Sequence, residues 1–159
     1  MRIRAAEQGD AAAIAAIWNR EIRDGVSTFN TAEKTRIEIA ELIAARGAGF
    51  IVAYMHGAVI GFATYFQFRG GPGYAHTMEH SIHLAEAARG QGTGRALMAV
   101  LEQNARAAGV HSLIAGIGGE NLSGVAFHTR VGFAPVARLP EVGRKFGRWM
   151  DLVLMQKFL

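Results

Sequence analysis

Apolar residues recur at helical spacing in two segments near the start of the chain. The first segment begins at Asp10, a residue type that caps helices through its side-chain oxygen, and the second covers residues 32–46 and ends at Gly47. The inward positions are Ile14, Ile17 and Trp18 in the first segment and Ile39, Leu42 and Ile43 in the second. This periodicity predicts two amphipathic helices joined by a polar loop over residues 24–31.

Apolar and aromatic runs bounded by turn residues predict the strands of a sheet. They cover Arg2–Arg4, Phe50–Tyr54, Val59–Phe68, Thr77–Leu84, Ser112–Ile117, Phe133–Leu139 and Trp149–Leu159. His56-Gly57 predicts a hairpin turn, residues 69–73 predict a loop, and residues 92–108 and 121–131 predict two further helices. The resulting order, βααβββαβαββ, contains no long linker or internal repeat. It predicts one α+β domain over residues 1–159, with a mixed sheet flanked by helices.

Composition narrows the function without deciding it. The chain has a formal net charge of +4 and no cysteine, which excludes disulfides, thiolate zinc sites and a cysteine nucleophile. Basic residues are scattered singly, without the motifs of nucleic-acid binding. His76, His80 and His83 lack the spacing and the carboxylate partners of a zinc site. Without a signal-peptide pattern or a membrane-length apolar run, we expect a cytoplasmic protein that uses no metal, nucleic acid or membrane.

The most informative segment is Arg89–Gly94, with the sequence RGQGTG, between a predicted strand and a predicted helix. A glycine-rich turn in this position points backbone N–H groups at an anion, and the helix adds its positive end. A P-loop would require Gly-Lys-Ser/Thr, but Arg95 follows Gly94. A dinucleotide fingerprint would require GxGxxG early in a βαβ unit. The pattern [R/Q]-x-x-G-x-[G/A] remains, alongside a plain glycine-rich connection that binds nothing.

Several separated segments of the chain occur together in an informative order. They are Ile17–Asn19, Glu79–Ile82, Arg89–Gly94, the stretch from Asn121 through His128 to Phe133, and Val142–Asp151. In this combination the chain resembles the GNAT superfamily of N-acetyltransferases over nearly its whole length. Within it, the chain is similar to the phosphinothricin and methionine sulfone/sulfoximine acetyltransferase branch. The resemblance implies a mostly antiparallel sheet, acetyl-CoA as the co-substrate, and a homodimer.

The resemblance also implies where the cofactor binds. The backbone of Ile82, His83 and Leu84 matches the strand that pairs with pantetheine, although the branch usually has tyrosine in place of His83. The pyrophosphate would bind the loop formed by Arg89, Gly90, Gln91, Gly92, Thr93, Gly94 and Arg95. Asn121 matches an asparagine near the cofactor.

Acetyl transfer to an amine requires a base, an oxyanion donor and a proton for the leaving thiolate. Glu79 matches the glutamate proposed as general base; the alternative is a half-exposed strand glutamate in a surface ion pair. By resemblance, the Leu84 N–H would stabilise the charge that develops on the thioester oxygen. His128 stands where many members carry a tyrosine. Its imidazole would either protonate the thiolate or simply pack within its helix.

The identity of the amine rests on fewer residues. Arg69 matches an arginine that contacts the amino-acid substrate, where it would hold the α-carboxylate by a forked contact; a solvated loop arginine is the alternative. Gly70 and Gly71 replace bulkier residues and predict a wider substrate pocket. Phe146 replaces a histidine of the herbicide-resistance enzymes, which favours L-methionine sulfone or sulfoximine over phosphinothricin. Two hypotheses stay open: a polyamine, aminoglycoside or protein N-terminus as acceptor, and a non-catalytic acyl-CoA sensor.

Overall fold

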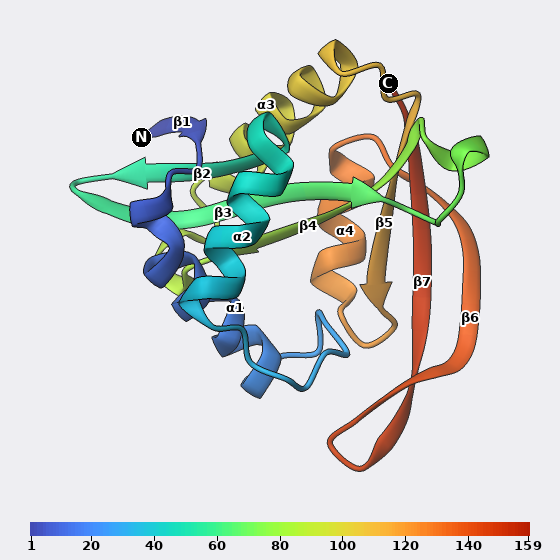
Figure 1. Cartoon of the computed structure of the whole chain (residues 1–159). Coiled ribbons are helices and arrows are strands. Elements are labelled where there is room, and N and C mark those ends of the chain that lie inside the picture. Colours follow the sequence, from blue (N-terminus) through green and yellow to red (C-terminus); the bar gives the residue numbers. More distant parts are fainter.

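A computed structural model describes the whole chain, Met1–Leu159. Its elements are β1 (Arg2–Ala5), α1 (Ala11–Asp24), α2 (Arg36–Arg46), β2 (Phe50–Met55), β3 (Ala58–Gln67), β4 (Thr77–Leu84), α3 (Thr93–Ala107), β5 (Ser112–Gly118), α4 (Leu122–Arg130), β6 (Ala134–Lys145) and β7 (Arg148–Phe158). The predicted order βααβββαβαββ and the α+β class are confirmed (Figure 1). No helix is long and apolar enough to cross a membrane.

The strands form one seven-stranded sheet in the order β1-β2-β3-β4-β5-β7-β6. Every neighbouring pair is antiparallel except β4 and β5, which run parallel. A parallel pair needs a crossover connection, and α3 supplies it between these two strands. The sheet is therefore the mixed, mostly antiparallel one that the resemblance implies, with its single parallel junction in the middle.

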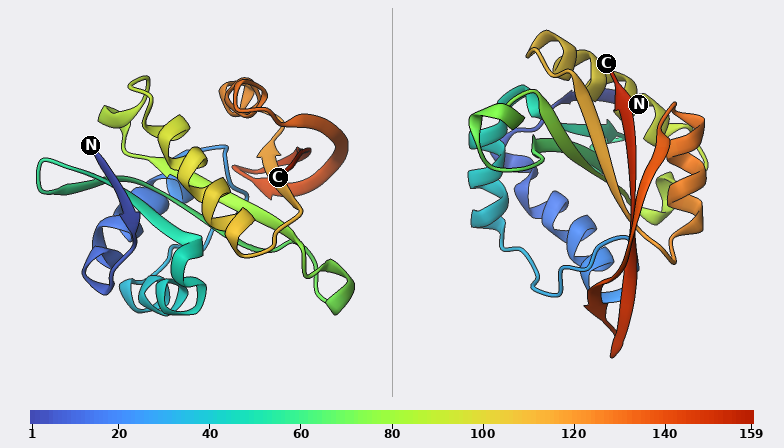
Figure 2. Two further views of the ribbon diagram at one scale, coloured as in Figure 1. Left: turned by 90° about the horizontal axis from the view of Figure 1, so that it is seen from above. Right: turned by 90° about the vertical axis from the view of Figure 1, so that its right-hand side faces the viewer.

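Helices cover both faces of the sheet, with α1 and α2 on one face and α3 and α4 on the other (Figure 2). The alternation of side chains along β2 and β3 gives each face its own core. Phe50, Val52 and Phe62 point toward α1 and α2, and they pack with Ile14, Trp18, Ile22, Ile39 and Ile43. Ile51, Ala53 and Ala63 point toward α3, and they pack with Leu97, Met98 and Leu101.

Two predictions about helix starts are wrong. The second helix begins at Arg36 rather than residue 32, because Thr35 forms a capping box with Glu38: the Thr35 hydroxyl accepts from the Glu38 N–H at 3.1 Å, and the Glu38 carboxylate accepts from the Thr35 N–H at 2.6 Å. Asp10 precedes α1 but does not cap it with its side chain. Its carboxylate instead accepts two hydrogen bonds from Arg4, at 2.7 and 3.0 Å, and one from the Glu7 N–H at 2.8 Å.

The C-terminal hairpin is longer than the sequence predicts. The sixth strand was expected over Phe133–Leu139, but β6 runs from Ala134 to Lys145 and pairs with β7 beyond a register shift. Every residue of β6 from Ala134 to Val142 is exposed, and its two buried residues, Gly143 and Lys145, have no apolar side chain that faces a core, so no alternation of apolar and polar residues reveals the strand. The turn has positive φ at Phe146 (54°) and Gly147 (73°), the geometry of a tight hairpin turn.

Candidate active site

The parallel strands β4 and β5 separate halfway along their length. Their pairing runs only from Thr77 opposite Ser112 to His80 opposite Ala115, while β4 continues to Leu84 and β5 to Gly118. The facing edges of the two strands beyond that point have no partner strand, so their backbone N–H and C=O groups are free to bind a ligand. An opening in the middle of the sheet is where the topology places the candidate site.

Two cavities meet at this opening. The smaller, of about 380 Å³, lies on the side of α1 and α2, and the larger, of about 600 Å³, lies between the ends of α1 and β4 and the start of α4. Five residues line both: Ser27, Ile82, His83, Asn121 and His128. The junction therefore connects a chamber for one ligand with a chamber for another, as a two-substrate reaction requires.

The larger cavity contains most of the residues predicted to bind the cofactor. Those that line it are Ile82, His83, Leu84, Arg89, Gly90, Gly94 and Asn121. Gln91, Gly92, Thr93 and Arg95 do not line it. Thr93 is buried as the first residue of α3, and the Gln91 side chain donates to the Ala87 carbonyl oxygen at 2.6 Å.

The glycine loop has the backbone conformation of an anion cradle. Gly90 and Gly92 have φ angles of 74° and 80°, in the left-handed region that glycine adopts without strain. The turn leads directly into the N-terminus of the 15-residue helix α3, whose first N–H groups have no partner within the helix. A pyrophosphate at this helix end would be stabilised by these donors and by the helix dipole. Arg89, the first residue of the loop, forms an ion pair with Glu21 near the end of α1.

Glu79 lines the smaller cavity on β4, below the point where the strands separate. Its side chain is half-buried, and no hydrogen bond or ion pair holds its carboxylate. Burial raises the pKa of Glu79 above its ordinary value. The surface ion pair considered as the alternative is absent from the structure. A carboxylate with a raised pKa, facing a cavity, is a stronger proton acceptor than one in water.

The imidazole of His128 lines both cavities and also lies within hydrogen-bonding distance of the imidazole of His80. The His128 Nδ1 lies 2.7 Å from the Gly124 carbonyl oxygen, which can only accept, so this nitrogen carries the proton. Its Nε2 lies 2.9 Å from the Nε2 of His80, which must then be the donor between two neutral rings. Burial lowers the pKa of both histidines, in His80 to about 3. A neutral His128 in this arrangement has no N–H directed at a leaving thiolate. Its role as an acid stays a prediction.

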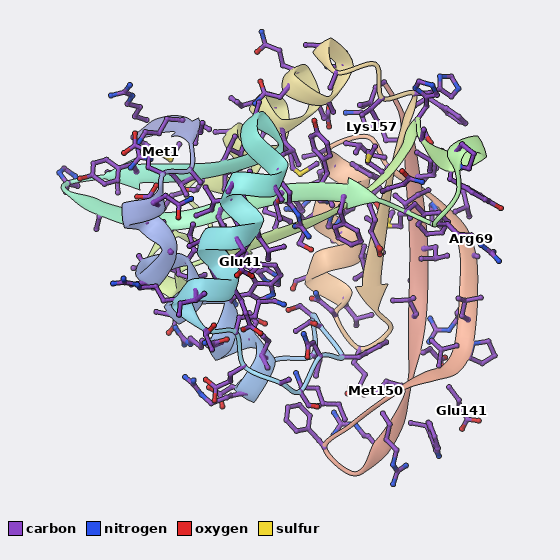
Figure 3. All side chains as sticks on the ribbon, in the orientation of Figure 1. Met1, Glu41, Arg69, Glu141, Met150 and Lys157 are labelled. Atoms are coloured by element: carbon purple, nitrogen blue, oxygen red, sulfur yellow. The ribbon has the colours of Figure 1, made fainter.

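Arg69, Gly70 and Gly71 lie outside both cavities. Figure 3 shows Arg69 in the loop that joins β3 to β4. The Arg69 guanidinium stands 5.7 Å from the centre of the Tyr74 ring, and the side chain is exposed. Within one chain the structure therefore does not bring Arg69 together with Glu79, and its contact with the substrate stays a prediction.

Sequence reasoning missed other residues that line the smaller cavity. Arg46 and Lys34 both contribute a positive charge there, and neither forms an ion pair. Arg46 is the last residue of α2, and Lys34 lies just before the start of that helix. In the sequence, a basic residue at either place is typical of an exposed surface position. Ser27 and Thr28 lie in the segment that was interpreted only as a polar loop. No local pattern marks these residues, because the fold alone brings them to β4.

A family model described as an acetyltransferase (GNAT) domain matches residues 3–154. The chain belongs to the GNAT acetyltransferase family. The sequence is 35% identical over 159 residues to an L-methionine sulfoximine/L-methionine sulfone acetyltransferase from Salmonella typhimurium, covering 98% of this chain and 93% of that protein.

Solved GNAT structures agree with the fold. A ribosomal-protein-alanine N-acetyltransferase from Brucella melitensis is 38% identical, with a TM-score of 0.95 and coverage of 100% of both chains. The structure of yncA from Salmonella typhimurium with its cofactor acetyl-CoA is 35% identical, with a TM-score of 0.96, covering 100% of this chain and 94% of that one. As a GNAT member, the protein is an acetyl-CoA-dependent N-acetyltransferase, as the resemblance implied.

Proposed function

We propose that this GNAT enzyme acetylates the α-amino group of a small amino acid, with L-methionine sulfone or sulfoximine as the best candidates. The observation that carries the proposal is the unpaired carboxylate of Glu79 in a cavity that opens onto the cofactor chamber at Ile82 and His83. The relative that acetylates methionine sulfoximine and sulfone matches this chain over nearly its full length. The resemblance makes phosphinothricin a weaker candidate, because Phe146 replaces a histidine of the dedicated enzymes. Within one chain Phe146 lies in the β6–β7 turn, outside both cavities, so this argument rests on the resemblance alone.

The residues of the chain divide the chemistry between them. Acetyl-CoA, when bound, supplies the activated acetyl group as a thioester. Glu79, directly or through a water molecule, takes the proton from the ammonium group of the amino acid and so produces the neutral nucleophile. The free backbone edge at Ile82, His83 and Leu84 holds the pantetheine arm, and the Leu84 N–H stabilises the charge that develops on the thioester oxygen. The glycine loop and the α3 N-terminus hold the pyrophosphate.

A protein N-terminus is a second candidate acceptor, because the similar enzyme from Brucella melitensis is named for ribosomal-protein alanine. Polyamines and aminoglycosides are disfavoured. They are polycations, and the cavity beside Glu79 already contains the unpaired charges of Arg46 and Lys34. Two cations in the wall repel a polycation and attract an anionic group.

Release of free CoA distinguishes these functions. The purified enzyme is incubated with acetyl-CoA and, separately, with L-methionine sulfone, L-methionine sulfoximine, phosphinothricin, spermidine, an aminoglycoside and an alanine-initiated peptide. We expect the highest kcat/KM with the sulfone or the sulfoximine. Turnover confined to the peptide or to spermidine would reject the amino-acid substrate. Binding of CoA without turnover of any amine would leave the sensor hypothesis.

We also propose that the enzyme is a homodimer that pairs through the β6–β7 hairpin. Five large apolar side chains there are between 39% and 57% exposed, namely Val136, Leu139, Val142, Phe146 and Trp149. An exposed apolar group on an edge strand favours association. Sedimentation at micromolar concentration should give twice the chain mass, and a Val142→Ser, Trp149→Ser variant should give the monomer mass. The cytoplasmic location stays a prediction.

A further inference from the structure

Arg46 is a half-buried cation without an anionic partner. It ends α2, and its guanidinium lies 5.0 Å from the centre of the Phe66 ring. Its one side-chain hydrogen bond runs from Nη1 to the Thr64 hydroxyl oxygen, at 3.1 Å. No carboxylate lies within 4.0 Å, and burial lowers the pKa of the Arg46 guanidinium. A guanidinium has five N–H donors, so most of the donors of Arg46 have no protein partner.

The position of Arg46 is fixed relative to Glu79 by the register of the sheet. Thr64 and Phe66 are two positions apart on β3, so their side chains lie on the same face of the sheet. On the neighbouring strand β4, Thr64 is paired with Ser81 and Phe66 with Glu79. Directly opposed residues on antiparallel strands have side chains about 5 Å apart. The Arg46 guanidinium therefore lies over Phe66, the residue paired with Glu79. The side chains of Arg46 and Glu79 both line the smaller cavity.

This arrangement is costly unless an anion completes it. A buried charge without a partner loses hydration and gains little in return, and stacking on Phe66 offsets only part of that loss. Other arginines of the chain show the usual solution: Arg4 pairs with Asp10, and Arg148 pairs with Glu120. In the cavity the only carboxylate is Glu79, which remains separate. The cation and the carboxylate together form the complement of a zwitterion.

We propose that Arg46 binds the α-carboxylate of the amino-acid substrate while Glu79 faces its α-amino group. This inference rests on the proposed function and makes it more specific. The planar fork of the guanidinium matches a carboxylate with two parallel hydrogen bonds. It selects free amino acids over amines and over peptide N-termini, whose first residue has no free carboxylate. Arg69, which is exposed and stacks on Tyr74 outside the cavity, is not needed for this contact within one chain.

The test compares Arg46→Gln with Arg36→Gln, a matched control at the other end of α2 that is exposed and has no partner. Each enzyme is assayed with L-methionine sulfone and with its α-carboxamide, which keeps the amine but lacks the charge. We expect the wild type to prefer the acid at least about 10-fold in kcat/KM, as the loss of a charged partner in a buried pair predicts. Arg46→Gln should lower kcat/KM for the acid about 100-fold and change that for the amide less than about 3-fold. Arg36→Gln should change neither.

Two further measurements distinguish the loss of a substrate contact from misfolding of the variant. Arg46→Lys keeps the charge but loses the fork, so it should recover part of the preference. The Kd of acetyl-CoA and the Tm of each variant should remain close to those of the wild type. Retention of the full acid preference in Arg46→Gln would overturn the proposal. Loss of that preference in Arg69→Gln alone would overturn it in favour of Arg69.

Failure of the proposed function can be recognised separately. Calorimetry measures the binding of L-methionine sulfone to the CoA complex of each variant, with no turnover required. Binding that is lost in Arg46→Gln but not in Arg36→Gln supports the role of Arg46, even if the wild type acetylates only other amines. Equal binding to the wild type and Arg46→Gln would overturn the inference while leaving amino-acid acetylation intact. No binding and no turnover of the amino acid by the wild type would overturn both.

Discussion

The Nζ atom of Lys145 donates a hydrogen bond of 2.6 Å to the carbonyl oxygen of Gly25, on the far side of the active-site opening. It donates two more, to the carbonyl oxygens of Glu21 at 3.1 Å and Thr28 at 3.0 Å. Only 4% of Lys145 is exposed. One ammonium group in the C-terminal hairpin thus fixes the loop after α1, and residues of that loop line both cavities.

Lys145→Met should loosen this loop. The variant keeps the apolar stem but removes three charge-assisted hydrogen bonds and leaves the carbonyl oxygens of Gly25 and Thr28 without a donor, while that of Glu21 still accepts from the Gly25 N–H. We expect a loss of about 3 kcal/mol in the free energy of unfolding. Urea denaturation measures it. Because the same loop borders the substrate cavity, KM for the amine should rise more than kcat falls. Arg144→Met, at the neighbouring exposed position, is the control; equal effects in both variants would contradict the role of Lys145.

Replacing Glu79 by Gln should remove the proton acceptor and lower kcat/KM about 100-fold, the usual contribution of a general base. In the wild type, Glu79 acts as the ionised carboxylate, and burial raises its pKa. The rate should therefore fall as the pH decreases through that raised pKa, because protonated Glu79 cannot accept a proton. Profiles of kcat/KM between pH 5 and 9 check this at constant ionic strength. A Glu79→Gln enzyme with wild-type rates throughout would reject the assignment.

Gly116 provides the space in which the Glu79 carboxylate lies. A Cβ atom built on Gly116 would come within 2.6 Å of Glu79 Oε1, the far end of a side chain that can move. Gly116→Ala should therefore displace the carboxylate without disrupting β5, so kcat should fall at least about 10-fold, as misplacing a catalytic group does, while Tm changes little. Gly118→Ala is a contrasting variant. Its Cβ would meet the Val26 backbone oxygen at 2.2 Å, so this change should lower both Tm and kcat.

The sequence predicts the local structure of this enzyme better than it predicts contacts between residues that are far apart in the chain. Helical periodicity indicated α1, and a run bounded by turn residues predicted the strand β4 with its correct ends. The glycines at 90 and 92 predicted the loop that turns with positive φ. The separation of β4 from β5 left no such signal, because it depends on where the pairing of two distant strands ends. Arg46 was overlooked for the same reason: its partners Thr64 and Phe66 become neighbours only when α2 packs on β3.

Resemblance to a family supplied roles but could not supply surroundings. It identified Glu79 and His128 as candidate catalytic residues, yet it gave no indication that His128 hydrogen-bonds to His80. That contact depends on two residues 48 positions apart whose rings meet beside Phe133. A motif specifies residue types at chain positions, whereas the protonation state of a buried ring depends on what the fold packs against it.

The buried histidines should make the enzyme sensitive to mild acid. Desolvation, and after it the proximity of a second imidazole, that of His128, lowers the pKa of His80 to about 3. Desolvation likewise lowers the pKa of His83 to about 4, where its ring packs between Trp18 and Phe62. In the unfolded chain both rings titrate near pH 6.5.

Below pH 6.5 the two imidazoles therefore bind protons in the unfolded chain but stay neutral in the native state. The free energy of unfolding should consequently fall as the pH decreases from about 6.5 toward 4. The slope approaches about 1.4 kcal/mol per pH unit for each ring, or roughly 3 to 4 kcal/mol between pH 6.5 and 5 for both. Glu79, with its raised pKa, is protonated first in the native state and offsets part of the loss. Urea denaturation at pH 7.5 and pH 5.0 measures the difference, and His83→Phe should reduce it by about half. Equal slopes in the wild type and His83→Phe would show that the His83 ring titrates normally in the folded protein.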